Sequence, residues 1–441
     1  MIIIAREKEK QILEEMYSSN RSELIALYGR RRVGKTYLIR NFFKEKKCIY
    51  FEITGQKGEH GESVPIQHQL NNFQYAWKKA FNVSITKLSS WDEAFTQLKD
   101  KVDSMQTSSK IVVMFFDELP WLCTINSRFY ENFDQAWNAC FEPAGNVKIV
   151  VCGSASTWIL KKIIYAKAGL SRRVTQRIHL KPFTVKETAR FLKYKGFSLI
   201  PESVVETYML LGGIPYYLDF LSTKKSLYQN IDDECFDKDG NLFDEYGIVF
   251  DSLFRNSKNY KKAIECIAKK HKGCSFEEIL TELNSKENFP ASTLMQVLKN
   301  LYECDFINKR TQLFNDKKGI LYFVSDEFIL FYLKWIKTYE QKLESHGIFN
   351  QAISNSQAYS VWLGFSFESF CLKHQYEVRK GLGLHKIAAI PGMFYSYDAI
   401  TKKRNTQIDL LFDRADKTIT LCEIKFHSGD YTISKKDYDN L

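Results

Sequence analysis

The segment from Gly29 to Thr36 constrains the fold of this chain more than any other feature. It reads GRRRVGKT, which fits the pattern G-x-x-x-x-G-K-T, and it lies between an apolar run at 22–29 and an amphipathic stretch at 37–46. Glycines at such a turn let backbone amides close around phosphate oxygens without a Cβ in the way. Because a strand precedes the turn and a helix follows it, the segment predicts a nucleotide-binding loop.

The last two residues of this loop have expected chemical roles. Lys35 is predicted to place a point charge on the β and γ phosphates, and Thr36 to offer its hydroxyl to Mg²⁺. ATP with Mg²⁺ is therefore the expected cofactor. The loop residues expected to contact the nucleotide are Gly29, Arg32, Val33, Gly34, Lys35, Thr36 and Tyr37.

Two adjacent acids end an apolar run further along the chain, IVVMFFDE. Asp117 is predicted to hold the Mg²⁺ through water, and Glu118 to polarise the attacking water as the catalytic base. The next apolar run, VKIVVCGS, ends at Ser154. This serine either senses the γ-phosphate from the tip of a neighbouring strand or simply caps a helix.

The region that holds these motifs alternates between two patterns. Short apolar runs separated by amphipathic helical stretches are typical of a parallel sheet covered on both faces. We therefore expect an α/β domain with the P-loop fold at 1–183. The expected strands are 22–29, 48–54, 111–118 and 147–154, and the expected helices are 7–19, 37–46 and 90–102.

Two helical modules are expected after this domain. Helical patterns at 184–196 and 202–221 predict a helical lid within 184–258. Three helices and a two-stranded turn then predict a winged helix, with its following helix, within 259–350. Its expected segments are 259–271, 275–283, 291–307 and 308–324, with Ser275 and Ser292 as helix caps.

The partner of the winged helix is left open between DNA and a protein. Basic residues of the wing, Arg310, Lys317 and Lys318, suit contacts to phosphates. The candidate recognition helix offers only Lys299 as a strong positive charge, however, and residues that read bases are sparse. A protein-facing module that relays the state of the nucleotide site is the other interpretation.

The motifs together resemble a known family. In order, GRRRVGKT, FFDELPWL, CGSAS, LSRRVTQRIHLKPF and LGGIPYYL resemble archaeal and bacterial ATPases of the AAA class that are related to the signal-transduction ATPases with numerous domains. The resemblance covers residues 1–350. It implies that an N-terminal R-E-x-E segment, here Arg6, Glu7 and Glu9, lies near the adenine.

The same resemblance assigns a role to a GxP element, here Gly213, Ile214 and Pro215. In the family this element packs against the base and couples the state of the nucleotide to the lid. From the residues alone, Gly213 and Pro215 are equally well explained as a helix break.

Arg172 and Arg173 are candidate catalytic residues because they follow the flexible stretch AKAGLS. A guanidinium at this point can meet the developing γ-phosphate charge in its own chain or in a neighbouring subunit. The family resemblance puts an arginine here without fixing its role, and a solvated arginine is the alternative.

The C-terminal region carries a second candidate site on two alternating runs, 407–413 and 418–426. Asp409, Glu423 and Lys425 are expected to project from one side of this hairpin. The same short pattern also fits an alternating strand that carries a surface salt bridge.

With Glu368, these residues resemble the PD-(D/E)xK nuclease superfamily. The resemblance implies that Asp409 and Glu423 coordinate a divalent metal and that Lys425 orients the water or stabilises the phosphate. We expect a restriction-endonuclease-like α/β domain at 351–441. The chain ends at YDNL within a helical pattern where the family usually continues, so this domain is expected to be incomplete at its C-terminus.

Composition limits the remaining classes of protein. The 441 residues are 44% hydrophobic and 26% charged, which predicts several folded domains, and no apolar run is long enough to span a bilayer. No secretory signal is recognisable, so a cytoplasmic protein with ten reduced cysteines is expected. The net charge of +11 suits an anionic partner only weakly.

Three functions follow from these observations. The first is an ATP-binding and ATP-hydrolysing conformational switch, and the second is a metal-dependent nuclease gated by ATP. The third is a nucleic-acid-binding regulator with little or no turnover of ATP. The sequence leaves the oligomeric state open.

Overall fold

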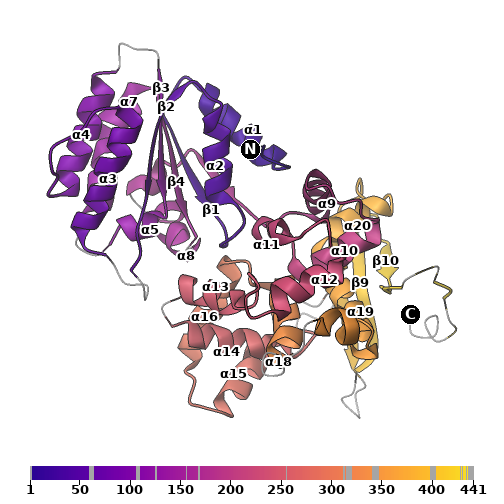
Figure 1. Ribbon diagram of the computed structural model, residues 1–441. Coiled ribbons are helices and arrows are strands. Elements are labelled where there is room, and N and C mark those ends of the chain that lie inside the picture. The colour runs from indigo at the N-terminus through magenta and orange to yellow at the C-terminus, as the bar shows by residue number, and fades with distance from the viewer. Residues whose placement is uncertain are drawn as a thin grey trace. The chain divides into compact units, whose positions relative to one another are not determined.

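The computed structural model divides the chain into two compact units, shown in Figure 1. Unit 1 comprises Met1–Phe183 with Ile214–Tyr216, and unit 2 comprises Thr184–Gly213 with Tyr217–Leu441. The structure describes residues 2–58, 64–105, 110–124, 127–154, 156–166, 169–254, 256–310, 313, 320–339, 347–397, 404–427, 429, 431–433 and 435.

Unit 1 is built on a five-stranded sheet in the order β2-β3-β4-β1-β5, in which every strand pair is parallel. The strands are β1 (Glu23–Tyr28), β2 (Cys48–Thr54), β3 (Ile111–Asp117), β4 (Val147–Gly153) and β5 (Gln176–His179). All seven residues of β4 and six of the seven of β3 are buried, as expected of central strands covered on both faces. The predicted parallel α/β domain is confirmed.

Helices cover both faces of this sheet, with α3 and α4 on one face and α1 and α2 on the other (Figure 1). The helical segments of unit 1 are α1 (Glu7–Ser18), α2 (Lys35–Lys44), α3 (Ile66–Phe81), α4 (Trp91–Asp103), α5 (Leu119–Leu122), α6 (Phe129–Ala136), η1 (Trp137–Phe141), α7 (Glu142–Ala144), α8 (Ser156–Ile159), η2 (Leu160–Ile164) and η3 (Gly169–Arg172). Helix α4 begins after Ser90, whose side chain accepts a hydrogen bond from the Glu93 amide.

The core between β3 and the helices is aromatic. Phe116 of β3 lies 5.2 Å from Phe133 and 5.8 Å from Phe129, measured between ring centroids. Phe95 of α4 stacks on Phe133 at 5.9 Å. These fully buried rings hold β3 in place, and its tip carries the acidic residues of the candidate site.

Unit 2 is mainly helical. Its helical segments are α9 (Val185–Tyr194), α10 (Pro201–Leu211), α11 (Pro215–Phe220, which begins in unit 1), α12 (Leu227–Ile231), η4 (Asp232–Phe236), α13 (Glu245–Leu253), α14 (Ser257–Ala268), α15 (Phe276–Asn284), α16 (Ala291–Glu303), α17 (Glu327–Phe331), η5 (Tyr332–Ile336), α18 (Lys337–Tyr339), η7 (Phe349–Ile353), α19 (Gln357–Lys373) and α20 (Gln375–Gly381). Ser275 caps α15 in a capping box with Glu278, as predicted. The prediction that Ser292 caps the next helix is wrong, because α16 begins at Ala291 after Pro290.

Two small antiparallel sheets complete unit 2. One pairs β6 (Ile307–Arg310) with β7 (Leu321–Val324), and the other has the order β10-β9-β8. The strands of the second are β8 (Ala389–Tyr397), β9 (Arg404–Arg414) and β10 (Ile419–Cys422). The strand expected at 418–426 therefore ends early, at Cys422. Lys317, Lys318 and the expected C-terminal helix lie outside the described residues.

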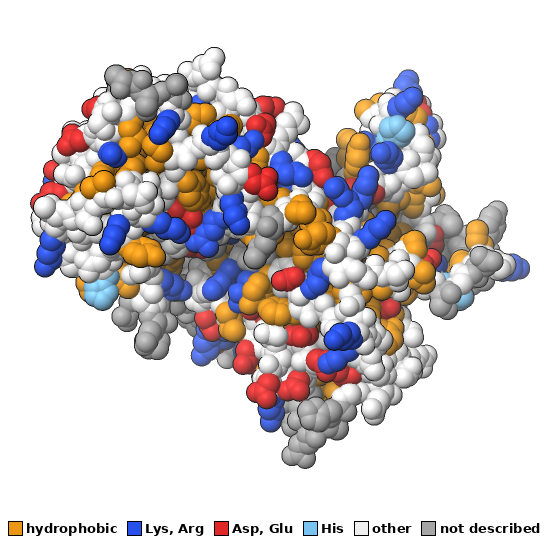
Figure 2. Space-filling view, turned by 45° about the horizontal axis from the view of Figure 1, so that its top comes forward, with side chains coloured by type: hydrophobic (Ala, Val, Ile, Leu, Met, Phe, Trp, Pro, Cys, Tyr) orange, Lys and Arg blue, Asp and Glu red, His pale blue; other side chains and the backbone are white. Residues whose placement is uncertain are grey.

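The surface and the helices add two observations. Basic side chains are interspersed with acidic ones over the face drawn in Figure 2. The positive net charge therefore does not single out a nucleic-acid surface on that face.

Within the part of the chain that the structure describes, no helix is long and apolar enough to cross a membrane.

Candidate nucleotide site

The GRRRVGKT loop joins the end of β1 to the start of α2. Gly29 has φ +149°, and a Cβ added there would lie 2.2 Å from the carbonyl oxygen of Leu180, so no side chain fits. Gly34 directly precedes α2 and has φ +88°, a left-handed conformation that favours glycine. Both glycines of the motif thus stand where the backbone requires them, and the N-terminus of α2 points at the loop.

The ammonium group of Lys35 lies over the loop. This side chain is buried, and Nζ donates hydrogen bonds to the carbonyl oxygens of Gly29 at 2.9 Å and Arg30 at 2.8 Å. An ammonium group has three N–H donors, so these two bonds leave capacity for a phosphate oxygen. The loop carbonyls therefore pre-orient Lys35 at the place where phosphates would bind.

Thr36 and Asp117 bring α2 and β3 together. The hydroxyl of Thr36 donates to Oδ2 of Asp117 at 2.7 Å, while Oδ1 of Asp117 accepts the backbone N–H of Glu118 at 3.0 Å. A hydroxyl and a carboxylate are the hard oxygen ligands that Mg²⁺ prefers. The pair is therefore suited to hold Mg²⁺ together with phosphate oxygens.

Glu118 lies beside Ser154 at the tips of two neighbouring strands. Its backbone has φ +47°, and its carboxylate accepts one bifurcated bond from the Ser154 hydroxyl, at 2.9 and 3.0 Å. Neither of the roles predicted for Ser154 included this contact. The signal for it was the strand order, because β3 and β4 are adjacent.

Arg6 fixes the N-terminal segment to the loop. Its guanidinium donates to the carbonyl oxygens of Lys181 at 2.8 Å and Val33 at 3.2 Å, and it lies 4.5 Å from the ring centroid of Phe183. The side chain is buried, and the residue directly precedes α1. Arg6 thus holds the phosphate loop through its hydrogen bond to Val33, a role that the family resemblance did not specify.

The other N-terminal residues of interest lie nearby. Glu7 and Glu9 form the first turn of α1. Tyr37 is 43% exposed, and its hydroxyl donates to the carbonyl oxygen of Ile2 at 3.2 Å. An exposed aromatic ring of α2 therefore contacts the N-terminal segment, within the region expected to receive the base.

The helical structure is interrupted between α10 and α11, where the GxP element was expected. Helix α10 ends at Leu211 and α11 begins at Pro215. Within unit 1, the guanidinium of Arg32 lies 3.9 Å from the ring centroid of Tyr216, which directly follows Pro215. This cation–π contact links the phosphate loop to the GxP segment. Sequence reasoning missed Tyr216, although the aromatic pair in LGGIPYYL was a visible signal.

Arg172 and Arg173 lie near the N-terminal ends of β5 and β1, whereas the phosphate loop follows the C-terminal end of β1. The Thr175 amide donates to Leu24, near the start of β1, and Arg173 is 4.0 Å from Glu142, which precedes β4. Strands advance about 3.3 Å per residue, so roughly 15 Å of strand separates this position from Gly29. The catalytic role of either arginine, in its own chain or in a neighbouring subunit, stays a prediction.

The C-terminal residues gather at the middle of β9, where its partner strand β10 ends. Asp409 is buried and accepts the backbone N–H of Ile424 at 3.1 Å, and Glu423 pairs with Lys425. Burial, followed by the charge of Asp409, raises the pKa of Glu368 to about 7, although Lys425 opposes the shift. Among the described residues, no group of three or more carboxylate, His or Cys side chains is arranged to hold a metal.

The sheet order, the loop after β1 and the acids at the tip of β3 define a P-loop NTPase fold. Residues 3–221 match the model of a family described as an ATPase domain predominantly from Archaea.

Individual proteins are also similar to this chain. An uncharacterised protein of Methanocaldococcus jannaschii is 28% identical over 446 aligned positions, covering 100% of this chain and 91% of the relative. An uncharacterised ATP-binding protein of the same organism is 47% identical over 47 residues, 11% of this chain and 80% of the relative. A Walker-type ATPase of Pyrococcus abyssi shares the fold at TM-score 0.53 and 21% identity, over 75% of this chain and 96% of that one.

Proposed function

We propose that this chain is an ATP-driven conformational switch that binds ATP with Mg²⁺ at the GRRRVGKT loop and hydrolyses it. The observation that carries the proposal is the 2.7 Å hydrogen bond between Thr36 and Asp117. It places a hydroxyl of the phosphate loop and a strand-tip carboxylate around one point, where a single Mg²⁺ would meet both.

The other residues divide the chemistry between them. Lys35 neutralises charge on the β and γ phosphates, and Glu118 takes the proton of the attacking water. Ser154 holds the Glu118 carboxylate through one bifurcated hydrogen bond, so it is a positioning residue. Bound Mg²⁺ supplies charge compensation on the phosphates.

Arg172 and Arg173 are proposed to act on the nucleotide of a neighbouring chain. Arg172 is exposed, and Arg173 makes a long, exposed contact with Glu142 at 4.0 Å. Such a pair contributes little stability, so either guanidinium is available to a neighbouring copy. Turnover that rises with protein concentration would support a role in a neighbouring subunit.

The module at 259–350 is proposed to be a winged helix that faces protein. Arg310 of β6 lies 4.8 Å from the ring centroid of Phe323, and its guanidinium approaches the sulfur of Met393 at 3.7 Å. Phe323, Met393 and Leu372 form a small apolar cluster. The base of the wing therefore packs against β8 and α19, which favours a relay of the nucleotide state over contact with DNA phosphates.

A second function, a metal-dependent nuclease, is favoured by one observation at the C-terminus. The charges of Asp409, Glu423 and Lys425 all act on the carboxyl group of Glu368, so four side chains of the D…ExK pattern lie close together. If the site is active, the chain with Mg²⁺ or Mn²⁺ should cut DNA or RNA, and Asp409→Ala should abolish cutting. Cutting that survives in Asp409→Ala would exclude this site.

The main proposal is tested by the nucleotide and its turnover. The purified chain should be analysed for bound ATP or ADP, because retained ADP indicates a slow switch. Phosphate release with ATP and Mg²⁺ should then be compared with release in EDTA. Absence of both bound nucleotide and Mg²⁺-dependent release would overturn the proposal.

A further inference from the structure

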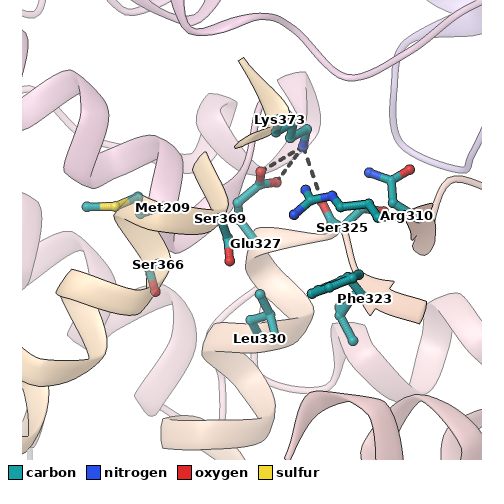
Figure 3. A pocket seen from close by; sticks show the side chains of 11 residues that line it. Met209, Arg310, Phe323, Ser325, Glu327, Leu330, Ser366, Ser369 and Lys373 are labelled. Carbon is teal, nitrogen blue, oxygen red and sulfur yellow. Dashed lines mark hydrogen bonds and ion pairs between the residues drawn. The ribbon is translucent and has the colours of Figure 1, made fainter. Parts of the chain in front are cut away.

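Glu327 and Lys373 form an ion pair within unit 2, drawn in Figure 3. Nζ of Lys373 lies 2.7 and 2.9 Å from the two carboxylate oxygens, and it also donates to the carbonyl oxygen of Ser325 at 3.2 Å. The side chain of Lys373 is only 26% exposed, and that of Glu327 is 13% exposed. Burial alone would lower the pKa of Lys373, but Glu327 and Tyr208 outweigh it and raise the pKa, so the lysine stays charged.

This ion pair joins three segments that are distant in sequence. Glu327 is the first residue of α17, directly after the β6–β7 hairpin, and Lys373 is the last residue of α19. Tyr208 of α10 lies with its ring centroid 5.4 Å from the same ammonium. The helix before the GxP segment, the wing and the C-terminal segment thus converge on one charge pair.

The turn that leaves α10 is packed against the carboxylate of this pair. Gly212 has φ +64°, and a Cβ added there would lie 3.0 Å from Oε2 of Glu327. A side chain at this position would be strained and would also press on the carboxylate. The next residues along the chain are Gly213 and then Ile214–Tyr216, which belong to unit 1 and include the ring beneath Arg32.

Helix α19 leads from the ion pair to the C-terminal cluster. Glu368 stands on the same helix as Lys373 and is close enough to Asp409 for the two charges to interact. Phe367 of the helix packs on Phe426 with ring centroids 5.2 Å apart. A displacement of the Lys373 end of α19 would therefore also shift the hairpin that carries Asp409, because packed helices move as rigid bodies.

We propose that the Glu327–Lys373 pair is a joint that transmits nucleotide-dependent movement of residues 212–216 to α19 and the C-terminal segment. The inference rests on the proposed function, since it requires that ATP binds at the loop. An exposed ion pair would be too weak and too mobile for this purpose, whereas a bidentate, largely buried pair holds its partners in one geometry. Coupling of this kind is reciprocal, so the C-terminal segment also biases the nucleotide site.

The experiment measures hydrogen exchange of the full chain with and without ATP and Mg²⁺. The hydrolysis-deficient Glu118→Gln background keeps the nucleotide state constant. The test variant is Lys373→Met, which removes the charge but keeps the length of the side chain, and Lys373→Arg restores the charge. The matched control is Lys337→Met, which breaks an exposed ion pair with Glu265 of 2.7 Å in the same unit. Binding of ATP is measured separately by calorimetry.

If the joint exists, ATP should change hydrogen exchange in both 204–216 and 357–373 in the parent and in Lys373→Arg. In Lys373→Met, ATP should bind within about twofold of the parent affinity and still change 204–216, while at least three quarters of the response in 357–373 is lost. Lys337→Met should respond like the parent. If ATP binds but 357–373 never responds, or responds equally in Lys373→Met, the joint is wrong. If ATP does not bind at all, the proposed function itself fails.

Discussion

The hydroxyl of Ser154 donates one bifurcated hydrogen bond to the two carboxylate oxygens of Glu118, which lie 2.9 and 3.0 Å from Oγ. The two residues come from the tips of adjacent parallel strands, and the backbone of Glu118 has φ +47°. A left-handed conformation is unfavourable for a glutamate, and the bond from Ser154 offsets part of this cost. The direction of the carboxylate is therefore set by β4 as well as by β3.

This relationship predicts a graded loss of hydrolysis. Glu118→Gln keeps the shape of the side chain but removes the base, so phosphate release should fall on the order of a hundredfold while ATP stays bound. Ser154→Ala leaves the base but not its orientation, and we expect a smaller loss of about tenfold, mainly in kcat. The double variant should be no slower than Glu118→Gln alone. A multiplicative loss in the double variant would show that Ser154 acts independently of Glu118.

Lys35→Ala is expected to weaken binding of ATP with Mg²⁺. The substitution removes a charge-assisted contact to the phosphates, which is worth roughly 1.5 to 3 kcal/mol. Calorimetric titration measures the change directly. Lys44→Ala is the control, because Lys44 is an exposed lysine at the far end of the same helix. Equal affinity of the Lys35 and Lys44 variants would remove Lys35 from the nucleotide site.

The sequence predicted the P-loop unit well because its signals are local. The apolar runs that form β1, β3 and β4 are buried on both faces, and the glycine motif needs only its neighbouring strand and helix for its meaning. Strand β5 was missed, because Ile178 is the only fully buried residue among its four. Helix α3 was missed as well, since its early turns are polar, and its buried Gln69 bonds backbone groups of the β2–α3 connection.

Relationships between distant residues could not be read from the sequence. Arg172 and Arg173 lie near the N-terminal end of β5. Which end of the sheet this is follows from the parallel pairing of β5 with β1, which no local pattern encodes. The ion pair of Glu327 with Lys373 likewise depends on how α17 and α19 pack. The hairpin of Asp409 was located correctly, but its second strand ends before Glu423, where the ladder stops.

Two serines near helix starts in unit 2 should differ in their contribution to stability. Ser275 accepts the Glu278 amide at 3.2 Å in a capping box, whereas Ser292 is an exposed residue one position inside α16. Ser275→Ala should lower the free energy of unfolding by about 1 kcal/mol, and Ser292→Ala should change it by less than about 0.5 kcal/mol. Thermal denaturation of both variants checks this order. A larger loss in Ser292→Ala would mean that α16 begins differently.

His374 should make the stability of unit 2 depend on pH. Its ring is buried, Nδ1 lies 3.0 Å from the carbonyl oxygen of Phe370, and the ring of Tyr208 meets it edge-on at 5.0 Å. Burial lowers its pKa from 6.5, and the bond to Phe370 and the charge of Glu327 offset this only in part. Its neighbour Lys373 adds to the lowering.

The sign follows from proton binding in the two states. Above about pH 6.5 the histidine is neutral in both, and its contribution to stability is fully present. As the pH falls below that value, the histidine is protonated in the unfolded chain but stays neutral in the folded chain, so the free energy of unfolding decreases. Between pH 7.5 and 5.5 the change of Tm in the wild type should therefore be more unfavourable than in His374→Phe, since the raised pKa of Glu368 acts equally in both proteins. Exposed His385, changed to Phe, is the control, and an equal change of Tm in all three proteins would exclude His374 as the cause.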